Sequence, residues 1–256
     1  MSSHRESVHA QFDPQAQAYL HSAVHAQGPD LRHAEQLAAR TLPATARVLD
    51  VGSGPGHLSM TLAPHVAEVV ALDPSPAMLS TLSEAAARAG LPHIATQVGS
   101  AEALPFEDGR FCLAATRYSA HHWTHLEQGL AQMHRVLKAG GYLLLIDTEA
   151  QDDALVDTHL QTIELLRDRS HVRNRTAAQW RALLAAAGFE VLDEARWPTR
   201  LEFASWGQRM RTPPQRVEVI RSLLEEAPQE VRAALQVESD GSFTIQTGLF
   251  WARKVA

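Results

Sequence analysis

The sequence predicts an α/β fold built on a doubly wound sheet of mostly parallel strands. Short, almost uninterrupted apolar runs alternate with helical segments over roughly the first 150 residues, which is typical of a parallel sheet covered by helices on both faces. A glycine-rich bend follows the first of these runs directly, as it does in doubly wound sheets that bind a ligand at their carboxyl edge. The length of 256 residues suits a single domain of this kind.

Five strands and three helices are expected between residues 43 and 150. Each strand is a run of apolar residues bounded by turn residues, and each helix is marked at its ends. Ser75 occupies the N-cap position of a helix whose first residue is Pro76, an arrangement that both residue types prefer. The expected strands are 47–51, 68–73, 94–99, 111–120 (with its exit loop) and 142–147, and the expected helices are 57–64, 76–90 and 126–141.

Helices dominate the two ends of the chain. Before the first strand, residues 12–40 are expected to form two helices with a break at Gly28-Pro29-Asp30. Thr176 and Gln179 form the pattern of a capping box, which marks a helix that ends at Gly188. The remaining expected elements are helices at 152–168 and 214–236, the latter divided by Pro228, and strands at 189–203 and 242–255.

The composition argues against nucleic acid as the main partner and favours a small molecule. The net charge is -6 with His neutral, whereas binding to phosphates requires clustered Lys and Arg. Only a local basic patch stays open, at Arg167, Arg169, Arg173 and Arg175. No run approaches the ~18 apolar residues of a membrane span, and the first residues lack the apolar segment of a secretory signal.

The single cysteine, Cys112, excludes an intrachain disulfide and fits a reducing, cytoplasmic location. It lies in the expected apolar strand 111–120, which does not supply the exposed, electropositive setting of a reactive thiol. We therefore expect Cys112 to pack as a small hydrophobic side chain.

The strongest local signal is the sequence VLDVGSGPGHLS over residues 48–59. Gly52, Gly54 and Gly56 stand between a strand and a helix, where the absence of Cβ allows unusual backbone angles and close approach of a ligand. The helix beyond presents unpaired N–H groups. These features predict a cradle for a nucleotide-sized ligand, although a tight turn without a ligand would use the same glycines.

Two acids beside this bend indicate the kind of ligand. Asp73 ends the second strand about 20 residues later, where a carboxylate can accept hydrogen bonds from both hydroxyls of a ribose. Asp50 directly precedes the bend, where it would repel a pyrophosphate. A dinucleotide fingerprint also requires glycine at the position of His57. S-adenosylmethionine, which carries a sulfonium and an ammonium but no phosphate, fits this site better than NAD(P).

Six segments occur in an order that resembles the class I S-adenosylmethionine-dependent methyltransferases, and more narrowly the ubiquinone/menaquinone biosynthesis methyltransferase-related group (methyltransferase type 11). They are DVGSGPG, ALDPSPAML, GSAEALPFEDGRF, RYSAHHW, RVLKAGGYLLLID and AAGFEVL. The resemblance covers about 45–195 and implies a Rossmann-like, seven-stranded sheet whose last strand is antiparallel. It implies one methyltransferase domain over 1–256. Its parts would be a helical lid (1–42), a cofactor-binding core (43–150) and a helical cap with the final strands (151–256), which includes a helical insertion at about 200–240.

The resemblance also implies which residues hold S-adenosylmethionine. The glycines would lie against its methionine part, Asp73 would hold the ribose, and lid residues would close over the site. Ser100 stands where this family often has an acid, so backbone groups would select the adenine. The implied cofactor-binding residues are Phe12, Tyr19, Asp50, Gly52, Gly54, Gly56, Asp73, Pro74, Met78, Ser100, Ala101, Glu102, Arg117 and Tyr118.

His121 and His122 are the candidate catalytic residues, because SAHHW leaves the fourth strand at its carboxyl end, beside the expected sulfonium. Methyl transfer is a direct displacement, so holding the acceptor in line with the S–CH3 bond should supply most of the rate. A general base would add roughly 10²- to 10⁴-fold if the acceptor is a hydroxyl or an acidic carbon. A metal cluster with His125 is the alternative. It needs three converging ligands, and adjacent histidines on a loop are expected to point in different directions, so we predict no metal.

Six further residues are candidates to line the substrate pocket. They are His25, Trp123, Asp168, His171, Arg173 and Trp206. For the segment RDRSHVR a solvated helix end is an equally good interpretation, and tryptophans are core residues by default. An aromatic wall would favour a small, apolar or aromatic acceptor that is methylated on O, C, N or S. An NAD(P)-dependent oxidoreductase and a cofactor-binding protein without methyl transfer are the alternatives.

Overall fold

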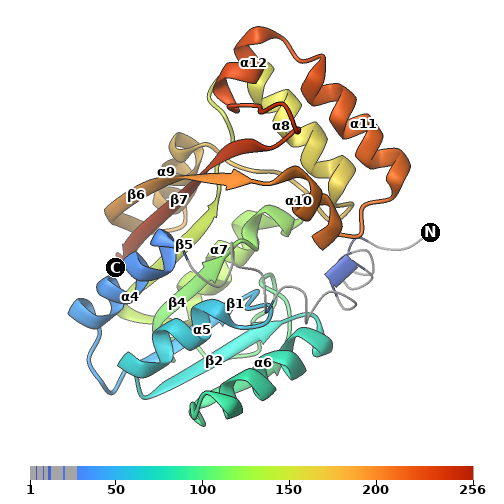
Figure 1. Cartoon of the computed structure of the whole chain (residues 1–256). Helices are drawn as coiled ribbons and strands as arrows, with labels where there is room; N and C mark the ends of the chain where they lie inside the picture. The colour runs from blue at the N-terminus through green and yellow to red at the C-terminus, as the bar shows by residue number, and fades with distance from the viewer. Residues whose placement is uncertain (1–3, 5–7, 9–10, 13–19, 21–27, 256) are drawn as a thin grey trace.

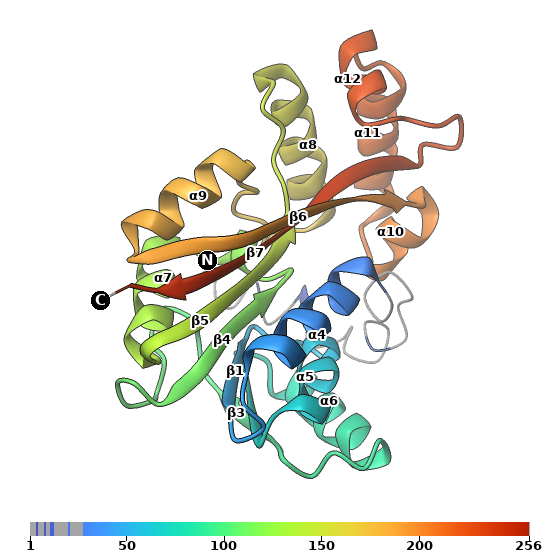
Figure 2. The same ribbon diagram turned by 90° about the vertical axis from the view of Figure 1, so that its left-hand side faces the viewer.

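The computed structural model describes residues 4, 8, 11, 12, 20 and 28–255. In this part of the chain, seven strands form one sheet in the order β3-β2-β1-β4-β5-β7-β6, with helices on both faces (Figures 1 and 2). The strands are β1 (Arg47–Val51), β2 (Glu68–Asp73), β3 (Ile94–Val98), β4 (Phe111–Arg117), β5 (Leu137–Thr148), β6 (Phe189–Leu201) and β7 (Phe243–Lys254). Only β7 runs antiparallel to its neighbours, so the predicted fold class is confirmed.

The helices begin where their capping residues predict. Ser75 accepts a hydrogen bond from the backbone N–H of Met78, and the capping box of Thr176 and Gln179 is complete. The helices and 3-10 turns of the described residues 28–255 are α4 (Pro29–Thr41), α5 (His57–Leu62), η2 (Ala63–His65), α6 (Pro76–Arg88), η3 (Ala120–His122), α7 (Leu126–Val136), α8 (Ala154–Arg167), α9 (Ala177–Ala186), α10 (Phe203–Arg209), α11 (Pro214–Glu225) and α12 (Gln229–Ala234).

Alternate residues of the central strands enter separate cores on the two faces of the sheet. In β1, Val48 packs in the core beneath α4 and α5, whereas Leu49 packs in the core with α7 and α9. In β4, Leu113 and Ala114 divide between the two cores in the same way. Burial on both faces explains why these strands are almost uninterrupted apolar runs. Cys112 is half-buried and packs at the edge of the first of these cores.

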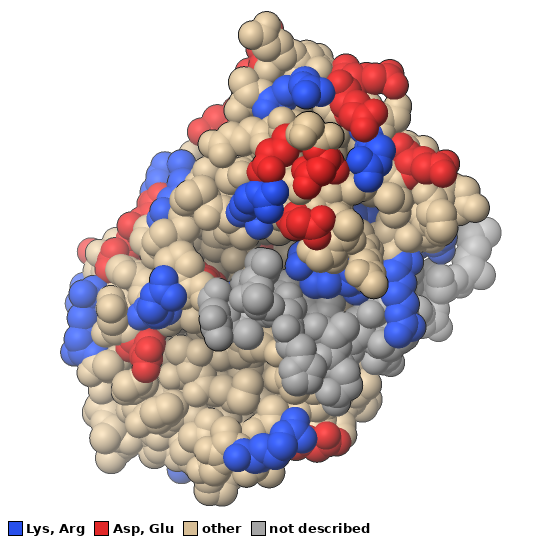
Figure 3. All heavy atoms as spheres, in the orientation of Figure 1, with Lys and Arg blue, Asp and Glu red and all other residues tan. Residues whose placement is uncertain are grey.

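A third core joins the cap to the far ends of β6 and β7. It contains apolar side chains of α8, α10, α11 and α12, including the fully buried Trp206 and Phe243. Figures 1 and 2 show these helices as a separate layer beyond the ends of the central strands. The space-filling view shows acidic and basic side chains interspersed on one face of this layer and of the sheet domain (Figure 3).

Two elements differ from the sequence-based prediction. The helix expected to end at 141 ends at Val136, because Leu137 pairs with Phe111 and begins an extended β5. Helix α10 falls within the helical insertion implied at about 200–240, but its start was not predicted, since strand patterning continues to 203. Glu202 caps it by accepting hydrogen bonds from the N–H groups of Ala204 and Ser205, and Glu is an uncommon residue in that role. Among the described residues, no helix has the length and apolarity required to cross a membrane.

Candidate active site

A cavity of about 300 Å³ lies where β1, β2 and β4 end, between the sheet domain and the cap. This volume is at the lower end of the range for small-molecule pockets, roughly 300–1,000 Å³. The cavity brings together most of the residues that the sequence singled out. Those that line it are Phe12, Asp50, Gly52, Gly54, Asp73, Pro74, Met78, Ser100, Ala101, Glu102, Arg117, Tyr118, His121, His122, Trp123, Asp168 and Trp206. Tyr19 and His25 lie outside the described residues.

The glycine-rich bend has a left-handed backbone at all three glycines, but only two of them reach the cavity. A Cβ on Gly54 (φ 52°) would meet no atom within 4 Å, so this backbone is open to a ligand. A Cβ on Gly52 would lie 1.9 Å from Oγ of Ser119. Gly56 (φ 91°) does not line the cavity. A Cβ there would lie 1.9 Å from Cδ1 of Leu82, so Gly56 is required for packing against α6, and the structure does not place it at the cavity as the sequence had suggested.

The carboxylate of Asp73 is held by the backbone on both sides. The N–H of Gly54 donates to Oδ2 and the N–H of Ser75 donates to Oδ1, each at 2.8 Å. These bonds tie the glycine bend after β1 to the start of α6 after β2. A carboxylate oxygen can accept more than one hydrogen bond, so Asp73 keeps capacity for ligand hydroxyls.

Asp50 is buried at the end of β1 and carries an acid-base property that the sequence did not reveal. Ser59 donates a hydrogen bond to Oδ2 at 2.6 Å, whereas Oδ1 is buried without a partner among the described residues. Burial is the main reason that the pKa of Asp50 rises to about 6, against the hydrogen bond from Ser59, and the charge of Asp73 adds to the rise. A positive charge in the cavity would stabilise the ionised form.

The chain leaves β4 through a strained turn that is fixed at several points. Arg117 donates to Oδ2 of Asp30 in a buried ion pair of 2.5 Å, which joins β4 to α4. Tyr118 has φ 50°, and its hydroxyl lies 2.9 Å from Oγ1 of Thr247. Burial raises the pKa of the Tyr118 phenol, so the side chain is a neutral wall of the cavity at neutral pH.

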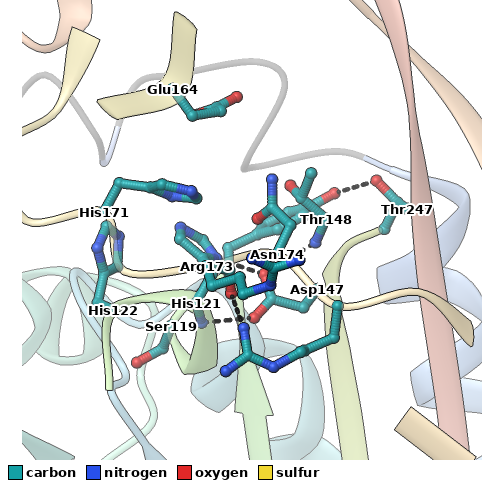
Figure 4. A network of polar contacts seen from close by, with 12 residues as sticks. Ser119, His121, His122, Asp147, Thr148, Glu164, His171, Arg173, Asn174 and Thr247 are labelled. Carbon is teal, nitrogen blue, oxygen red and sulfur yellow. Dashed lines mark hydrogen bonds and ion pairs between the residues drawn. The ribbon is translucent and has the colours of Figure 1, made fainter. Parts of the chain in front are cut away.

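The next residues form the 3-10 turn η3, which places His121 against the end of β5. The backbone N–H of His121 donates to Oδ2 of Asp147 at 3.0 Å, and its Nδ1 lies 2.5 Å from Oδ1 of the same carboxylate (Figure 4). Burial by itself would lower the pKa of His121. The charge and hydrogen bond of Asp147 outweigh this effect, with additions from Glu164 and Asp168, and the net pKa is raised.

The neighbouring histidines are less basic than His121. Burial and the charge of His121 lower the pKa of His122 to about 4, and its Nδ1 lies 3.0 Å from the carbonyl oxygen of Ser170. The rings of His121 and His122 have centroids only 4.1 Å apart, so the expectation that they point in different directions is wrong. The 3-10 turn and the acceptors on either side, Asp147 and Ser170, hold the two rings together.

Two residues predicted for the substrate pocket do not line the cavity. His171 lies behind His121, with ring centroids 5.8 Å apart, and its Nε2 is 2.8 Å from Oε1 of Gln161. Arg173 is exposed and pairs with Asp157. For these two residues the interpretation as structural or solvated side chains is the better one. The described residues contain no group of three His, Cys, Asp or Glu side chains placed to hold a metal ion.

The cap contributes an apolar wall and a buried acid to the cavity. Trp206, Leu201 and Ile245 line it, and the guanidinium of Arg167 lies 4.8 Å from the ring of Trp206. Glu164 on α8 lines the same side, is 7% exposed, and pairs with Arg167 at 3.6 Å. Burial raises the pKa of Glu164, against the opposing charge of Arg167.

Sequence analysis missed several of these residues, and only one carried a usable signal. Asp147 ends the apolar run YLLLID, and carboxyl ends of neighbouring parallel strands meet at one edge of a sheet, so it could have been placed near His121. Glu164, Arg167, Leu201 and Ile245 carry no comparable signal, because their place in the cavity depends on how the cap folds over the sheet.

Residues 48–141 match the family model described as a methyltransferase domain. The uncharacterized protein YafE of Escherichia coli is 39% identical over 201 residues, which are 78% of this chain and 97% of YafE. The uncharacterized methyltransferase YcgJ of Bacillus subtilis is 34% identical over 86% of this chain and 87% of its own length. The crystal structure of YcgJ has a TM-score of 0.82, at 31% identity over 88% of this chain and 99% of that chain.

The demethylmenaquinone methyltransferase of Chlorobaculum tepidum is 36% identical over 102 residues, 40% of each chain. This chain belongs to the class I S-adenosylmethionine-dependent methyltransferases, as the order of its motifs indicated. It is therefore an enzyme of the methyltransferase class, and the NAD(P)-dependent oxidoreductase kept as an alternative is set aside.

Proposed function

We propose that the chain binds S-adenosylmethionine in this cavity and transfers its methyl group to a small, apolar or aromatic acceptor. The observation that carries the proposal is the division of the cavity into two unlike ends. One end has the open backbone of Gly54 beside Asp50 and Asp73, and the other has the apolar wall of Trp206, Leu201 and Ile245.

The polar end fits a cationic adenosyl ligand. Asp50 has a buried oxygen with no partner among the described residues and a pKa of about 6, so a nearby cation lowers the cost of ionising it. Asp73 would hold the ribose hydroxyls, and Gly54 would let the methionine part approach. A pyrophosphate would raise the cost of ionising Asp50, which argues against NAD(P). When bound, S-adenosylmethionine supplies an electrophilic methyl group.

The acceptor class is inferred from the cap, because the match to the demethylmenaquinone methyltransferase covers only 40% of the chain. Trp206 is almost fully buried and lines the cavity, while Leu201 and Ile245 extend the apolar surface. Flat or apolar molecules gain the most from such a wall. The charged groups on the same side, Glu164 and Arg167, already pair with each other at 3.6 Å, which favours an uncharged acceptor.

Two measurements test the proposal. Calorimetric titration with S-adenosylhomocysteine against NADH reports the cofactor, and we expect binding of the first only. Transfer of an isotope-labelled methyl group into a panel of quinols and phenols and of small polar amines reports the acceptor, and we expect the aromatic compounds to be preferred. Preference for the amines would remove the apolar acceptor, and absence of both binding and transfer would remove the cofactor assignment.

A further inference from the structure

We propose that Nε2 of His121 is the general base of the transfer, with Asp147 as its positioning residue. The acceptor is then a neutral hydroxyl or an acidic carbon, which must lose a proton when it gains the methyl group. An amine or a thioether, which attacks through a free lone pair, is not the natural acceptor. This inference rests on the proposed function and names the class of acceptor for the same site.

Asp147 fixes both the position and the tautomer of His121. Its side chain is fully buried, and it receives hydrogen bonds from the backbone N–H groups of His121 (3.0 Å) and Thr148 (2.8 Å). The carboxylate of Asp147 therefore acts as an acceptor on both oxygens. Nδ1 of His121, 2.5 Å from Oδ1, then carries a proton and donates it to this carboxylate in a hydrogen bond. In the neutral ring the lone pair then lies on Nε2.

The second nitrogen is the one left for a substrate. His121 lines the cavity, its side chain is 14% exposed, and no hydrogen bond from the described residues reaches Nε2. The turn η3 follows β4, whose neighbour β1 leads into the glycine bend. His121 and the cofactor cradle are therefore on adjacent strand ends of one cavity, as a base beside the reacting atoms requires.

His122 has the wrong surroundings for this role. Its Nδ1 faces the carbonyl oxygen and hydroxyl of Ser170 at 3.0 and 3.2 Å, and its ring packs against Phe12 in a T-shaped contact with centroids 5.1 Å apart. Asp168, the nearest carboxylate to Nε2, is 3.9 Å away, too far for a hydrogen bond. His122 therefore stays neutral at pH 7 and is a weak base, whereas a buried carboxylate holds His121.

The charges around His121, taken together, favour its protonated form. Asp147 on β5, Glu164 on α8 and Asp168 after α8 are acidic, while His122 on η3 and His171 in the following segment are neutral at pH 7. A base whose pKa is near the working pH accepts a proton most effectively.

In the methyl-transfer step, the acceptor O–H or C–H bond breaks and its proton goes to Nε2. The electron pair left behind forms the bond to the methyl group, and the sulfur keeps the pair of the broken S–CH3 bond.

Histidine NMR on the nitrogen-15-labelled full-length protein tests the dyad without any acceptor. We expect His121 to be protonated on Nδ1 when neutral and to titrate above the ordinary value of about 6.5. Asp147→Asn should lower this pKa and remove the tautomer preference. Glu35→Gln is the matched control, because Glu35 forms a half-exposed pair with His65 at 3.0 Å and should leave the His121 signals unchanged. A His121 pKa below the ordinary value, or one unaffected by Asp147→Asn, overturns the proposal.

Labelled methyl transfer to a series of phenols of decreasing pKa tests the role in the reaction. For weakly acidic phenols, His121→Gln should slow transfer roughly 10²- to 10⁴-fold, the usual contribution of a general base. The loss should shrink for phenols that are already ionised, an effect that a merely structural histidine would not produce. An equal loss across the series, or preferred methylation of amines, overturns the proposal. If the wild-type protein fails to bind S-adenosylhomocysteine, the proposed function fails, and the NMR result decides the dyad separately.

Discussion

The two ends of the cavity are built in different ways. The cofactor end is made by one short stretch, in which the Gly54 N–H donates to Asp73, 19 residues later in the chain. The acceptor end combines side chains from η3, β5, α8 and the cap, and its contacts join distant positions, such as His121 with Asp147 and His122 with Ser170. Under the proposed function, the cofactor is held by groups close together in the sequence, whereas the acceptor is contacted by groups that packing brings together from distant positions.

Asp73→Ala should give the largest effect and act on the cofactor end alone. The substitution removes two acceptor oxygens for the ribose, each charge-assisted bond contributing ~1.5–3 kcal/mol, and also releases the N–H groups of Gly54 and Ser75. We expect affinity for S-adenosylhomocysteine to fall by roughly 10²-fold or more, measured by calorimetry. Asp73→Asn separates the two contributions, since one oxygen remains. Unchanged affinity in Asp73→Ala would place the cofactor elsewhere.

The fold was predictable because its signals are local. The strands β1 and β2 and the caps of α6 and α9 follow from apolar runs and capping residues, and all were found where expected. The end of α7 was misplaced, because pairing of Leu137 with Phe111 outweighs the helical pattern that continues beyond it. The start of helix α10 was not predicted, because it depends on the side chain of Glu202.

Most of the residues predicted for the site line the cavity, but the sequence could not separate a residue that faces the cavity from one that packs behind it. Gly52 and Gly54 were placed correctly at the cavity, but Gly56 shares the same pattern for a different reason, its contact with Leu82. His171 and Arg173 resembled pocket residues and lie outside it. At the acceptor end, Asp147 could have been placed near His121 because both follow neighbouring parallel strands, whereas nothing in the sequence indicated that Glu164 lies beside them.

The glycine bend allows a sharp contrast between packing and binding. Gly56→Ala places a methyl group 1.9 Å from Leu82 in a left-handed backbone, which costs about 1–2 kcal/mol before any clash. We expect a lower Tm, by at least about 2 °C for a chain of this size. Gly54→Ala meets no protein atom, so it should carry only the backbone strain and should weaken S-adenosylhomocysteine binding about tenfold or more. Equal losses of Tm and of affinity in both variants would contradict the assignment.

The raised pKa of Asp50 predicts that cofactor affinity depends on pH. Because its pKa in the folded protein is about 6, above the ordinary 3.8, the carboxylate loses its charge as the pH falls below about 6. Affinity for the cationic ligand should then drop about tenfold between pH 7 and pH 5. Asp50→Asn should bind weakly at both pH values. The same shift means that folding stability falls as the pH rises from about 4 to about 6, a decline that Asp50→Asn should lack. A pH-independent affinity would contradict the contact with a cation.

Glu164→Gln should have the smallest effect on the cofactor, and it tests whether the two ends are independent. Burial raises the pKa of Glu164, so the folded state prefers the protonated form and loses stability as the pH rises above the ordinary value of this carboxyl group. Gln removes the charge and keeps the shape, so the variant should be as stable as the wild type at acidic pH and more stable at neutral pH. Its affinity for S-adenosylhomocysteine should stay within about twofold, since no contact links Glu164 to the glycine bend. A large loss of affinity would show that the cap helps to hold the cofactor, and the contrast between a local cofactor end and a long-range acceptor end would then fail.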